Sequence, residues 1–307
     1  MTITANQLAQ RAEGIGASEV AAVLGLDPYR TAYDVWAEKT GKIVRADDPP
    51  SAAAEMGNLL EPVIGRMAEA EIGSRVVRPT GTYKSDNGVM LANLDFQVGR
   101  AQRGADIVEA KSTHIAEGWG EAGSCDVPER VYLQVHAQML CSASLLAYVA
   151  RLCGRFGFEF ALYRVPFNAR LAHTIEDGVC AFWHNHVVKD IPPEDSVPSE
   201  ETYKRFRRVA RKSVAIAAEL VADWRAKDAA AKTSEKLAAD AKARVIAALG
   251  DAEEGTSDAG RVTYFEATRG GFDAERFRKD HPDLAAMYAR QTVYRTCRFV
   301  PAKEVRS

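Results

Sequence analysis

The segment from Arg75 to Ser112 constrains the fold of this 307-residue chain more than any other part of it. Short runs rich in Val, Thr, Tyr and Ile are broken at Asp86-Asn87-Gly88 and again from Gly99 to Gly104. β-branched and aromatic residues favour strands, and Asn-Gly or glycine-rich breaks favour turns. The segment therefore predicts an antiparallel meander with strands at about Val76–Lys84, Val89–Val98 and Ala105–Ser112.

Helices are predicted on both sides of this meander. Before it, short helices are expected at Ser18–Gly25 and Thr31–Gly41, with Thr31 as N-cap. A further helix is expected at about Leu60–Ile72, with Pro62 in its first turn because proline lacks an N–H. The periodicity after the meander predicts, in order, a helix, two strands and a helix, at Glu129–Ser144, Leu146–Cys153, Phe156–Val165 and Ala169–Val188.

The composition changes past Pro198. Residues Tyr203 to Leu249 are rich in Ala, Lys, Glu and Arg and contain neither Gly nor Pro, which predicts one long helix or a helical hairpin. The stretch from Thr263 to Pro301 reads as a strand, a helix after Asp273 and a second strand, QTVYRTCRFV. We therefore expect a main domain over residues 1–198 and a helical and small α+β extension over residues 199–307.

The chain has the composition of a reduced, soluble protein. Its five cysteines are scattered and form no CxxC pair, which argues against a structural zinc or iron-sulfur site. Neither a signal peptide nor an apolar run long enough to span a membrane is evident, so a cytoplasmic location with no membrane partner is expected. Forty basic and forty-two acidic side chains argue against a protein that coats nucleic acid non-specifically.

Two carboxylates and a lysine lie in the apolar strands of the predicted meander. Asp95 is part of MLANLDFQV, and Glu109 and Lys111 are part of DIVEAKST. Residues two apart in a strand project from one face, and the intervening turn brings Asp95 alongside the other two. Acids in buried strands are costly unless they meet a metal or a partner. Oxygen ligands for Mg²⁺ and a nearby cation suit phosphodiester hydrolysis, whereas the alternative interpretation is a solvated strand edge.

Five blocks follow one another along the chain: RAEGIGASEVAAVLGLDPYRTAYDVWAEKTG, MGNLLEPVIG, MLANLDFQV, VEAKST and YLQVHAQML. In sequence and in order they resemble the lambda-exonuclease/YqaJ family of phage recombination nucleases. Together they cover about residues 11 to 190. The resemblance implies a restriction-endonuclease-like core of the PD-(D/E)XK superfamily, in which helices flank a mixed β-sheet.

The resemblance also implies a metal site. Asp95 and Glu109 would bind catalytic Mg²⁺, as two ions, and the backbone carbonyl of Ala110 would complete the ligand shell. Glu61 would be the helix-borne acid of the same site, acting through water. Because all of these ligands are oxygen donors, Mn²⁺ would fit the same site.

Two further pairs of residues are implied to act on the substrate. Lys111 would orient the attacking water, and Gln134 would support that lysine; an exposed amide is the alternative for Gln134. Arg11 and Ser18 would form a pocket for a 5′-terminal phosphate, since a helix N-terminus and a guanidinium both bind anions. The alternative is that Ser18 only caps its helix and Arg11 is surface charge.

The function implied is a Mg²⁺-dependent 5′-to-3′ exonuclease on double-stranded DNA ends, which leaves 3′ single strands for recombination by annealing. Implied partners are a single-strand annealing protein and further copies of the chain in a ring, with a trimer favoured, in a phage or prophage host. The alternatives are a structure- or sequence-specific endonuclease and a non-catalytic DNA-binding module. Trp119, which follows the predicted catalytic strand, is a candidate contact for the DNA strand or simple packing.

Overall fold

The computed structural model describes residues 13–43, 51–154, 157–206, 209, 211–268, 270–289 and 297. The chain divides into two compact units, Met1–Arg208 and Val209–Ser307. The first unit extends past the boundary predicted at residue 198 because helix α7 (Glu200–Arg205) packs on it. The N–H of Ser199 donates to Asp34 Oδ1 at 2.8 Å, and the rings of Phe206 and Tyr33 lie 6.1 Å apart.

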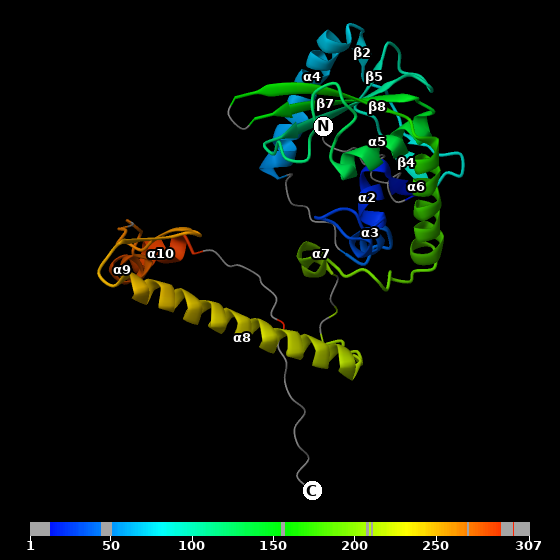
Figure 1. Cartoon of the computed structure of the whole chain (residues 1–307). Coiled ribbons are helices and arrows are strands. Elements are labelled where there is room, and N and C mark those ends of the chain that lie inside the picture. The colour runs from blue at the N-terminus through cyan, green and yellow to red at the C-terminus, as the bar shows by residue number, and fades with distance from the viewer. Residues whose placement is uncertain are drawn as a thin grey trace. The chain divides into compact units, whose positions relative to one another are not determined.

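A five-stranded mixed sheet forms the centre of the first unit (Figure 1). Its strands lie in the order β2 (Val76–Val77), β5 (Phe96–Val98), β6 (Ile107–Thr113), β7 (Leu146–Cys153) and β8 (Glu159–Pro166). Strands β6 and β7 are parallel, and the other pairs are antiparallel. The expected 105–112 and 146–153 strands are thus confirmed as the two central strands.

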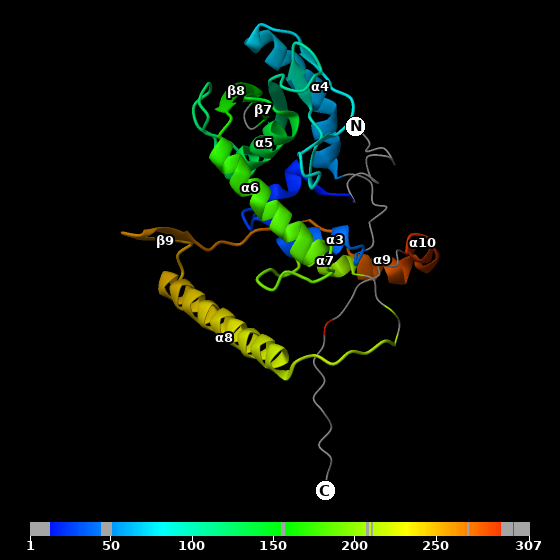
Figure 2. The ribbon, with the colours of Figure 1, turned by 90° about the vertical axis from the view of Figure 1, so that its right-hand side faces the viewer.

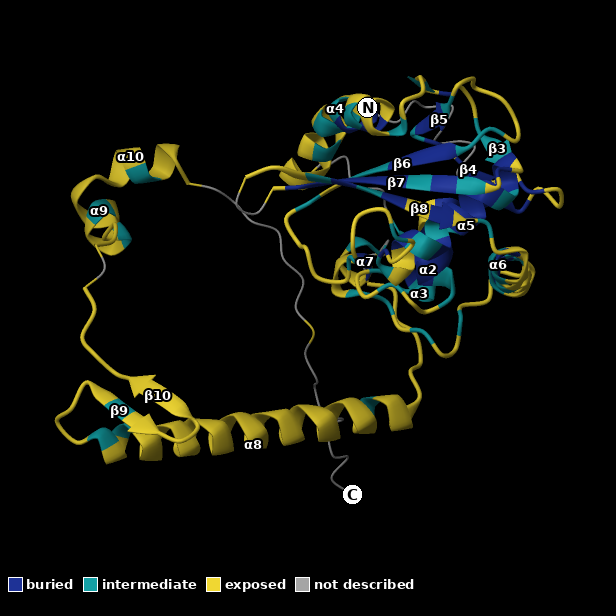
Figure 3. Ribbon diagram, turned by 45° about the horizontal axis from the view of Figure 1, so that its top comes forward, coloured by how far each residue is buried: buried dark blue, intermediate teal, exposed yellow. Residues whose placement is uncertain are grey.

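Helices cover both faces of this sheet (Figure 2). One face packs against α4 (Ala52–Ile72) through a cluster that includes Ile64, Phe96 and Val108. The other face and its neighbouring strands bury the larger cluster beneath α2 (Val20–Val23), α3 (Ala32–Lys39), α5 (Glu129–Ser142) and α6 (Ala169–Phe182). Burial is concentrated in the sheet and in α5 (Figure 3). The expected architecture, a mixed sheet flanked by helices, is confirmed.

The predicted strands Val76–Lys84 and Val89–Val98 are each divided between two sheets. Strands β1 (Ile15–Gly16), β4 (Met90–Ala92) and β3 (Tyr83–Lys84) form a small separate sheet in that order. The chain leaves it at Asn93 and enters the main sheet at Phe96. Asn93 Oδ1 accepts a hydrogen bond from Thr82 Oγ1 at 2.8 Å. The apolar run of the sequence hides this break, because only the polar partners of Asn93 and Asp95 reveal it.

Helix α4 begins eight residues before the predicted start at Leu60, at Ala52, where the Ser51 side chain accepts from the N–H of Ala54. The expectation that Pro62 lies in the first turn is wrong, because Pro62 is inside the helix. The proline removes one helical hydrogen bond. Burial of Ile64 and Ala68 against the sheet offsets that loss.

The remaining elements of the first unit follow the predicted order. The predicted Ser18–Gly25 helix is a 3-10 turn η1 (Ala17–Glu19) followed by α2, and α6 continues into the π-helical turn η2 (Trp183–Val187). The Thr31 cap is confirmed, since its side chain accepts from the N–H of Asp34. Gly41 follows α3 at φ +66°, a conformation that favours glycine.

The second unit contains α8 (Ala218–Leu249), β9 (Glu254–Ser257), β10 (Gly260–Thr263), α9 (Ala274–Asp280) and α10 (Pro282–Met287). A continuous helix from Tyr203 is wrong, because the chain is non-helical from residue 211 to 217 and Arg211 lies at φ +62°. The helix expected after Asp273 is confirmed. Of QTVYRTCRFV, only Cys297 is among the described residues. Within the described ranges, no helix is long and apolar enough to cross a membrane.

Candidate active site

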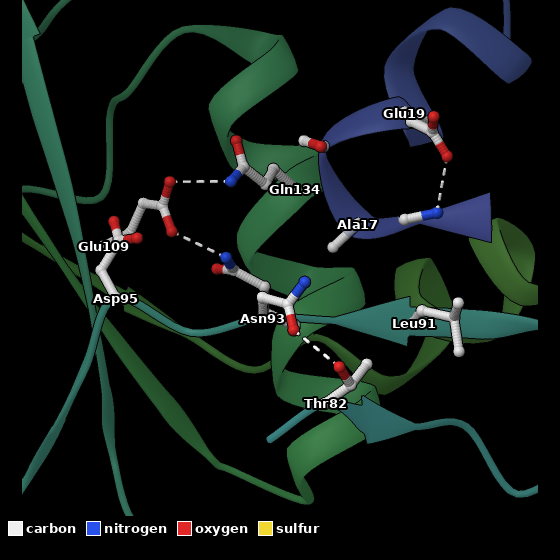
Figure 4. Close-up of a pocket in the computed structure, with 11 residues that line it drawn as sticks. Ala17, Glu19, Thr82, Leu91, Asn93, Asp95, Glu109 and Gln134 are labelled. Atoms are coloured by element: carbon white, nitrogen blue, oxygen red, sulfur yellow. Dashed lines mark hydrogen bonds between the residues drawn. The ribbon is translucent and has the colours of Figure 1, made fainter. Parts of the chain in front are cut away.

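A cavity of about 230 Å³ opens between the two sheets and helix α5 (Figure 4). Several parts of the chain line it, among them the η1 turn, the end of β4, the residue before β5, strand β6 and helix α5. The polar side chains that line it are Ser18, Glu19, Thr82, Asn93, Asp95, Glu109, Gln134 and Gln138. Asp95, Glu109, Gln134 and Ser18, four of the predicted site residues, therefore share one cavity.

The two-residue repeat of β6 places Glu109 and Lys111 on one face of the strand, as predicted. Val108 packs into the cluster beneath α4, whereas Glu109 and Lys111 project from the opposite face towards α5. Asp95 lies just before β5, and its Oδ2 accepts a hydrogen bond from the N–H of Ala110 at 2.9 Å. The backbone of β6 thus fixes Asp95 beside Glu109.

Three donors hold the Glu109 carboxylate, which is only 4% exposed. Gln134 Nε2 donates to Oε1 and Gln138 Nε2 to Oε2, each at 2.7 Å. Lys111 Nζ also lies 2.7 Å from Oε1 and donates to Gln134 Oε1 at 3.0 Å. Gln134 therefore bridges the acid and the lysine and fixes their mutual orientation.

The cavity is short of positive charge. Burial raises the pKa of Asp95 well above its usual value, and the charges of Glu109 and Glu61 raise it further. The Ala110 N–H and the Lys111 ammonium oppose this shift but do not cancel it. A cation in the cavity would favour the charged form of Asp95.

The donor set fits a hard divalent cation such as Mg²⁺. Asp95 and Glu109 offer carboxylate oxygens, and Gln138 Oε1 is buried without a hydrogen-bond partner. An orphaned acceptor of this kind suits a cation or one of its waters. In the described part of the chain, no three His, Cys, Asp or Glu side chains group closely enough to bind a metal by themselves. Water and backbone carbonyls, including that of Ala110, would therefore supply the remaining ligands.

Glu61, like Lys111, is a predicted site residue that does not line the cavity. It lies inside α4, which covers the opposite face of the sheet, and not at the helix start as predicted. Its Oε1 is 2.6 Å from Arg78 Nη2. The Glu61 charge still raises the pKa of Asp95, so the two groups remain within electrostatic reach.

The phosphate-binding pair is only partly described. Ser18 is exposed and lines the cavity, whereas Arg11 lies outside the described residues. The alternative that Ser18 caps its helix is wrong, because the N-cap is Gly16. The Gly16 N–H is not free for an anion, since it donates to Glu19 Oε2 at 2.8 Å.

Gln138, Asn93 and Thr82 line the cavity but were not predicted. Gln138 follows Gln134 by four residues, which places both amides on one side of α5. That spacing was visible in QVHAQ, yet glutamine pairs at this spacing are common on ordinary helices. Asn93 and Thr82 gave no signal, because their meeting depends on the break between β4 and β5.

Residues 7–144 match the family model of the YqaJ-like viral recombinase domain. This segment is similar to YqaJ-like viral recombinase domains. The match includes Asp95, Glu109, Lys111 and Gln134, and it confirms the resemblance that the sequence blocks indicated. The cavity thus lies within the YqaJ-like domain.

One curated protein matches this chain over a longer stretch than the family model does. The uncharacterized protein YqaJ of Bacillus subtilis strain 168 is 28% identical over 206 residues. That match covers 65% of this chain and 62% of the relative, so the chain spans less than two thirds of the relative's length.

Similar solved structures include two phage-type or alkaline exonucleases. LHK-Exo, an alkaline exonuclease from Laribacter hongkongensis, has a TM-score of 0.48 and 21% identity over 61% of this chain and 94% of that chain. A phage-related exonuclease from Haemophilus somnus 129PT has a TM-score of 0.42 and 10% identity over 58% of this chain and 96% of that chain.

Proposed function

We propose that this chain is a metal-dependent deoxyribonuclease that digests linear double-stranded DNA from its 5′ ends. The 3′ single strands that it leaves would serve recombination by single-strand annealing. The observation that supports this function best is the group formed by Asp95, Lys111 and the buried Glu109, with Gln134 bridging the last two, inside a segment similar to YqaJ-like domains. A solvated strand edge does not require a carboxylate held by three donors.

Asp95, Glu109 and the Ala110 carbonyl would hold Mg²⁺, with Glu61 acting through water if it takes part. A bound Mg²⁺ would polarise the phosphate and lower the pKa of a nearby water. Lys111, held by Glu109 and Gln134, would orient that water by hydrogen bonding and stabilise the charge that develops on the phosphate oxygens. The water oxygen bonds to phosphorus, the P–O bond to the neighbouring nucleotide breaks, and the leaving oxygen takes up a proton.

The Ser18 side of the cavity would receive the 5′-terminal phosphate, together with Arg11. Ser18 supports this proposal because it lines the same cavity as the two carboxylates. A terminal phosphate held there would set the scissile bond at a fixed distance from the chain end. The reaction would then release mononucleotides and not cut internally.

The deciding experiment is digestion of linear duplex DNA with and without a 5′-phosphate, in Mg²⁺ and in EDTA. We expect metal-dependent release of mononucleotides, faster from phosphorylated ends. Internal cuts would favour an endonuclease, and DNA that is bound but never cut would favour a non-catalytic module. Equal rates on phosphate and hydroxyl ends would contradict the terminal-phosphate pocket.

The Lys111→Ala variant tests the chemistry within the same assay. It should lower cleavage by at least about 100-fold, the order seen when one preorganised group at a transition state is removed, with DNA binding retained. Lys204→Ala is a matched control, because Lys204 is an exposed lysine in an ion pair with Glu200. Cleavage at the wild-type rate by Lys111→Ala would refute the assignment of this lysine.

The proposed partners need separate measurements. Light scattering would test the ring-shaped homo-oligomer, for which a trimer is the favoured state. Co-purification with a single-strand annealing protein, before and after removal of residues 209–307, would test whether the second unit carries that interaction.

A further inference from the structure

A second cavity, of about 340 Å³, lies beside Lys111, which lines it together with Ser112 and Thr113 of β6. Three segments line it: the loop after α2 with Tyr29, the end of β6 with the loop as far as Trp119, and the first turn of α5 with Arg130. Its volume falls within the range of about 300–1,000 Å³ that is usual for small-ligand pockets. The cavity is therefore large enough for one organic ring system.

The two cavities are consecutive along the same elements. On β6, Glu109 lines the first cavity and Lys111 lines the second. On α5, Gln134 lines the first and Arg130, one turn earlier on the same side of the helix, lines the second. Lys111 lines the second cavity and contacts Glu109 of the first at 2.7 Å. A polymer bound at Lys111 therefore lies next to both cavities.

The second cavity presents an exposed aromatic ring. Tyr29 is 71% exposed, and the guanidinium carbon of Arg130 lies 5.6 Å from the centre of its ring. The N–H of Tyr29 donates to Asp27 Oδ1 at 2.8 Å, which anchors the loop that carries the ring. Exposed aromatic rings paired with arginine are surfaces on which nucleobases stack.

The charge of this cavity suits a base better than a phosphate. The positive charges of Lys111 and Arg130 are matched by the acids Glu117 and Glu129, which also line it. A phosphate would meet no net positive charge there, whereas an uncharged ring would meet Ile115 and other apolar side chains.

We propose that this second cavity binds a nucleobase of the DNA strand that runs past Lys111, stacked on the ring of Tyr29. The inference rests on the proposed nuclease function and deepens it. The nucleotide bound there lies on the opposite side of the scissile phosphate from Ser18. Holding its base would keep the phosphodiester seated at Lys111.

The test compares Tyr29→Leu with Tyr29→Phe, which keeps the ring, and with Tyr288→Leu, a control at a tyrosine of similar exposure in the second unit. Binding to a 5′-phosphorylated duplex is measured by fluorescence anisotropy in EDTA, where cleavage is not expected. Each of the first four nucleotides from the 5′ end is made abasic in turn. Tyr29→Leu should bind intact DNA at least about fivefold more weakly, and the two controls should bind as the wild type does.

The abasic series identifies the base. For the wild type, one abasic position should weaken binding by the same factor as Tyr29→Leu, and that position should cost the variant nothing further. Wild-type binding by Tyr29→Leu, or an abasic penalty of equal size in both proteins at every position, would overturn the proposal. A wild type that binds but never cleaves DNA would instead refute the nuclease function while leaving the stacking result readable.

Discussion

Replacing Asp95 with Asn is expected to stabilise the metal-free protein while abolishing its proposed activity. The structure compensates the two buried carboxylates unequally. Glu109 has Lys111 and two amide donors, whereas Asp95 accepts, among the described residues, one hydrogen bond, from the N–H of Ala110. The Asn side chain keeps that hydrogen bond and has nearly the same shape, so the substitution removes charge without creating a cavity.

The size of the effect follows from two opposing changes. Two like charges about 5 Å apart repel by about 3 kcal/mol at an effective dielectric constant of about 20. The variant loses about 1 kcal/mol because its hydrogen bond to the Ala110 N–H is no longer charge-assisted. We therefore expect a gain of about 2 kcal/mol in the free energy of unfolding, within the range known for stabilising substitutions at functional sites.

The stability difference between Asp95→Asn and the wild type should depend on pH, and the pKa of Asp95 sets the direction of that dependence. Burial, followed by the Glu109 charge, raises the pKa of Asp95 in the folded state above its unfolded value. Stability linked to the protonated carboxyl is thus fully present below about pH 3.9 and is lost as the pH rises through the folded-state pKa. The advantage of Asp95→Asn should be large at pH 8 and should vanish near pH 4.

Denaturant unfolding in EDTA, followed by tryptophan fluorescence, measures this difference, since Trp36, Trp119 and Trp183 report on the first unit. Asp86→Asn is the control, because the side chain of Asp86 is 97% exposed. Mg²⁺ should stabilise the wild type more than Asp95→Asn. A variant less stable than the wild type at pH 8 would refute the charge argument.

Two further predictions concern the support of the cavity. Glu19→Gln should destabilise the protein by about 3 kcal/mol at pH 8, since it removes a carboxylate that pairs with the buried Lys39 ammonium. Although burial raises the pKa of Glu19, Lys39 and Arg30 outweigh it and lower the pKa overall, so the loss measured by denaturant unfolding should shrink as the pH falls below about 4.5. Gly14→Ala should lower the melting temperature, measured by circular dichroism, by several degrees, because its Cβ would lie 2.4 Å from the carbonyl oxygen of Val89. An unchanged melting temperature would contradict this prediction and would mean that the backbone at Gly14 can move away from Val89 at no cost.

Strand β6, which carries Glu109 and Lys111, could be predicted from the sequence because its side chains obey a local rule. The two-residue period placed Glu109 and Lys111 on one face wherever the strand lay in the fold. The capping pattern of Thr31 and Asp34 is equally local and was equally readable. Features set by a few neighbouring residues survive folding unchanged.

The features that were predicted wrongly or missed depend on residues that are distant in the sequence. Pro62 was placed at a helix start by a local rule, but packing of α4 on the sheet overrides the cost of an internal proline. The division of the apolar run around Asn93 depends on Thr82 and Ala110, which lie elsewhere in the chain. Gln138 becomes part of the site only because folding brings it within hydrogen-bonding distance of Glu109.

The passage of the chain from the small sheet to the main sheet, through Asn93, Leu94 and Asp95, limits which changes of length the protein can tolerate. The turn between β5 and β6 could lengthen while leaving both strand ends in register. One residue added between Asp95 and Phe96 would instead shift the alternation and turn Asp95 away from the Ala110 N–H, and one added between Ala92 and Asp95 would push β4 or β5 out of register with its neighbours. Insertions and deletions should therefore be accepted at the turn and rejected at the passage, and libraries of single-residue insertions would map that boundary directly.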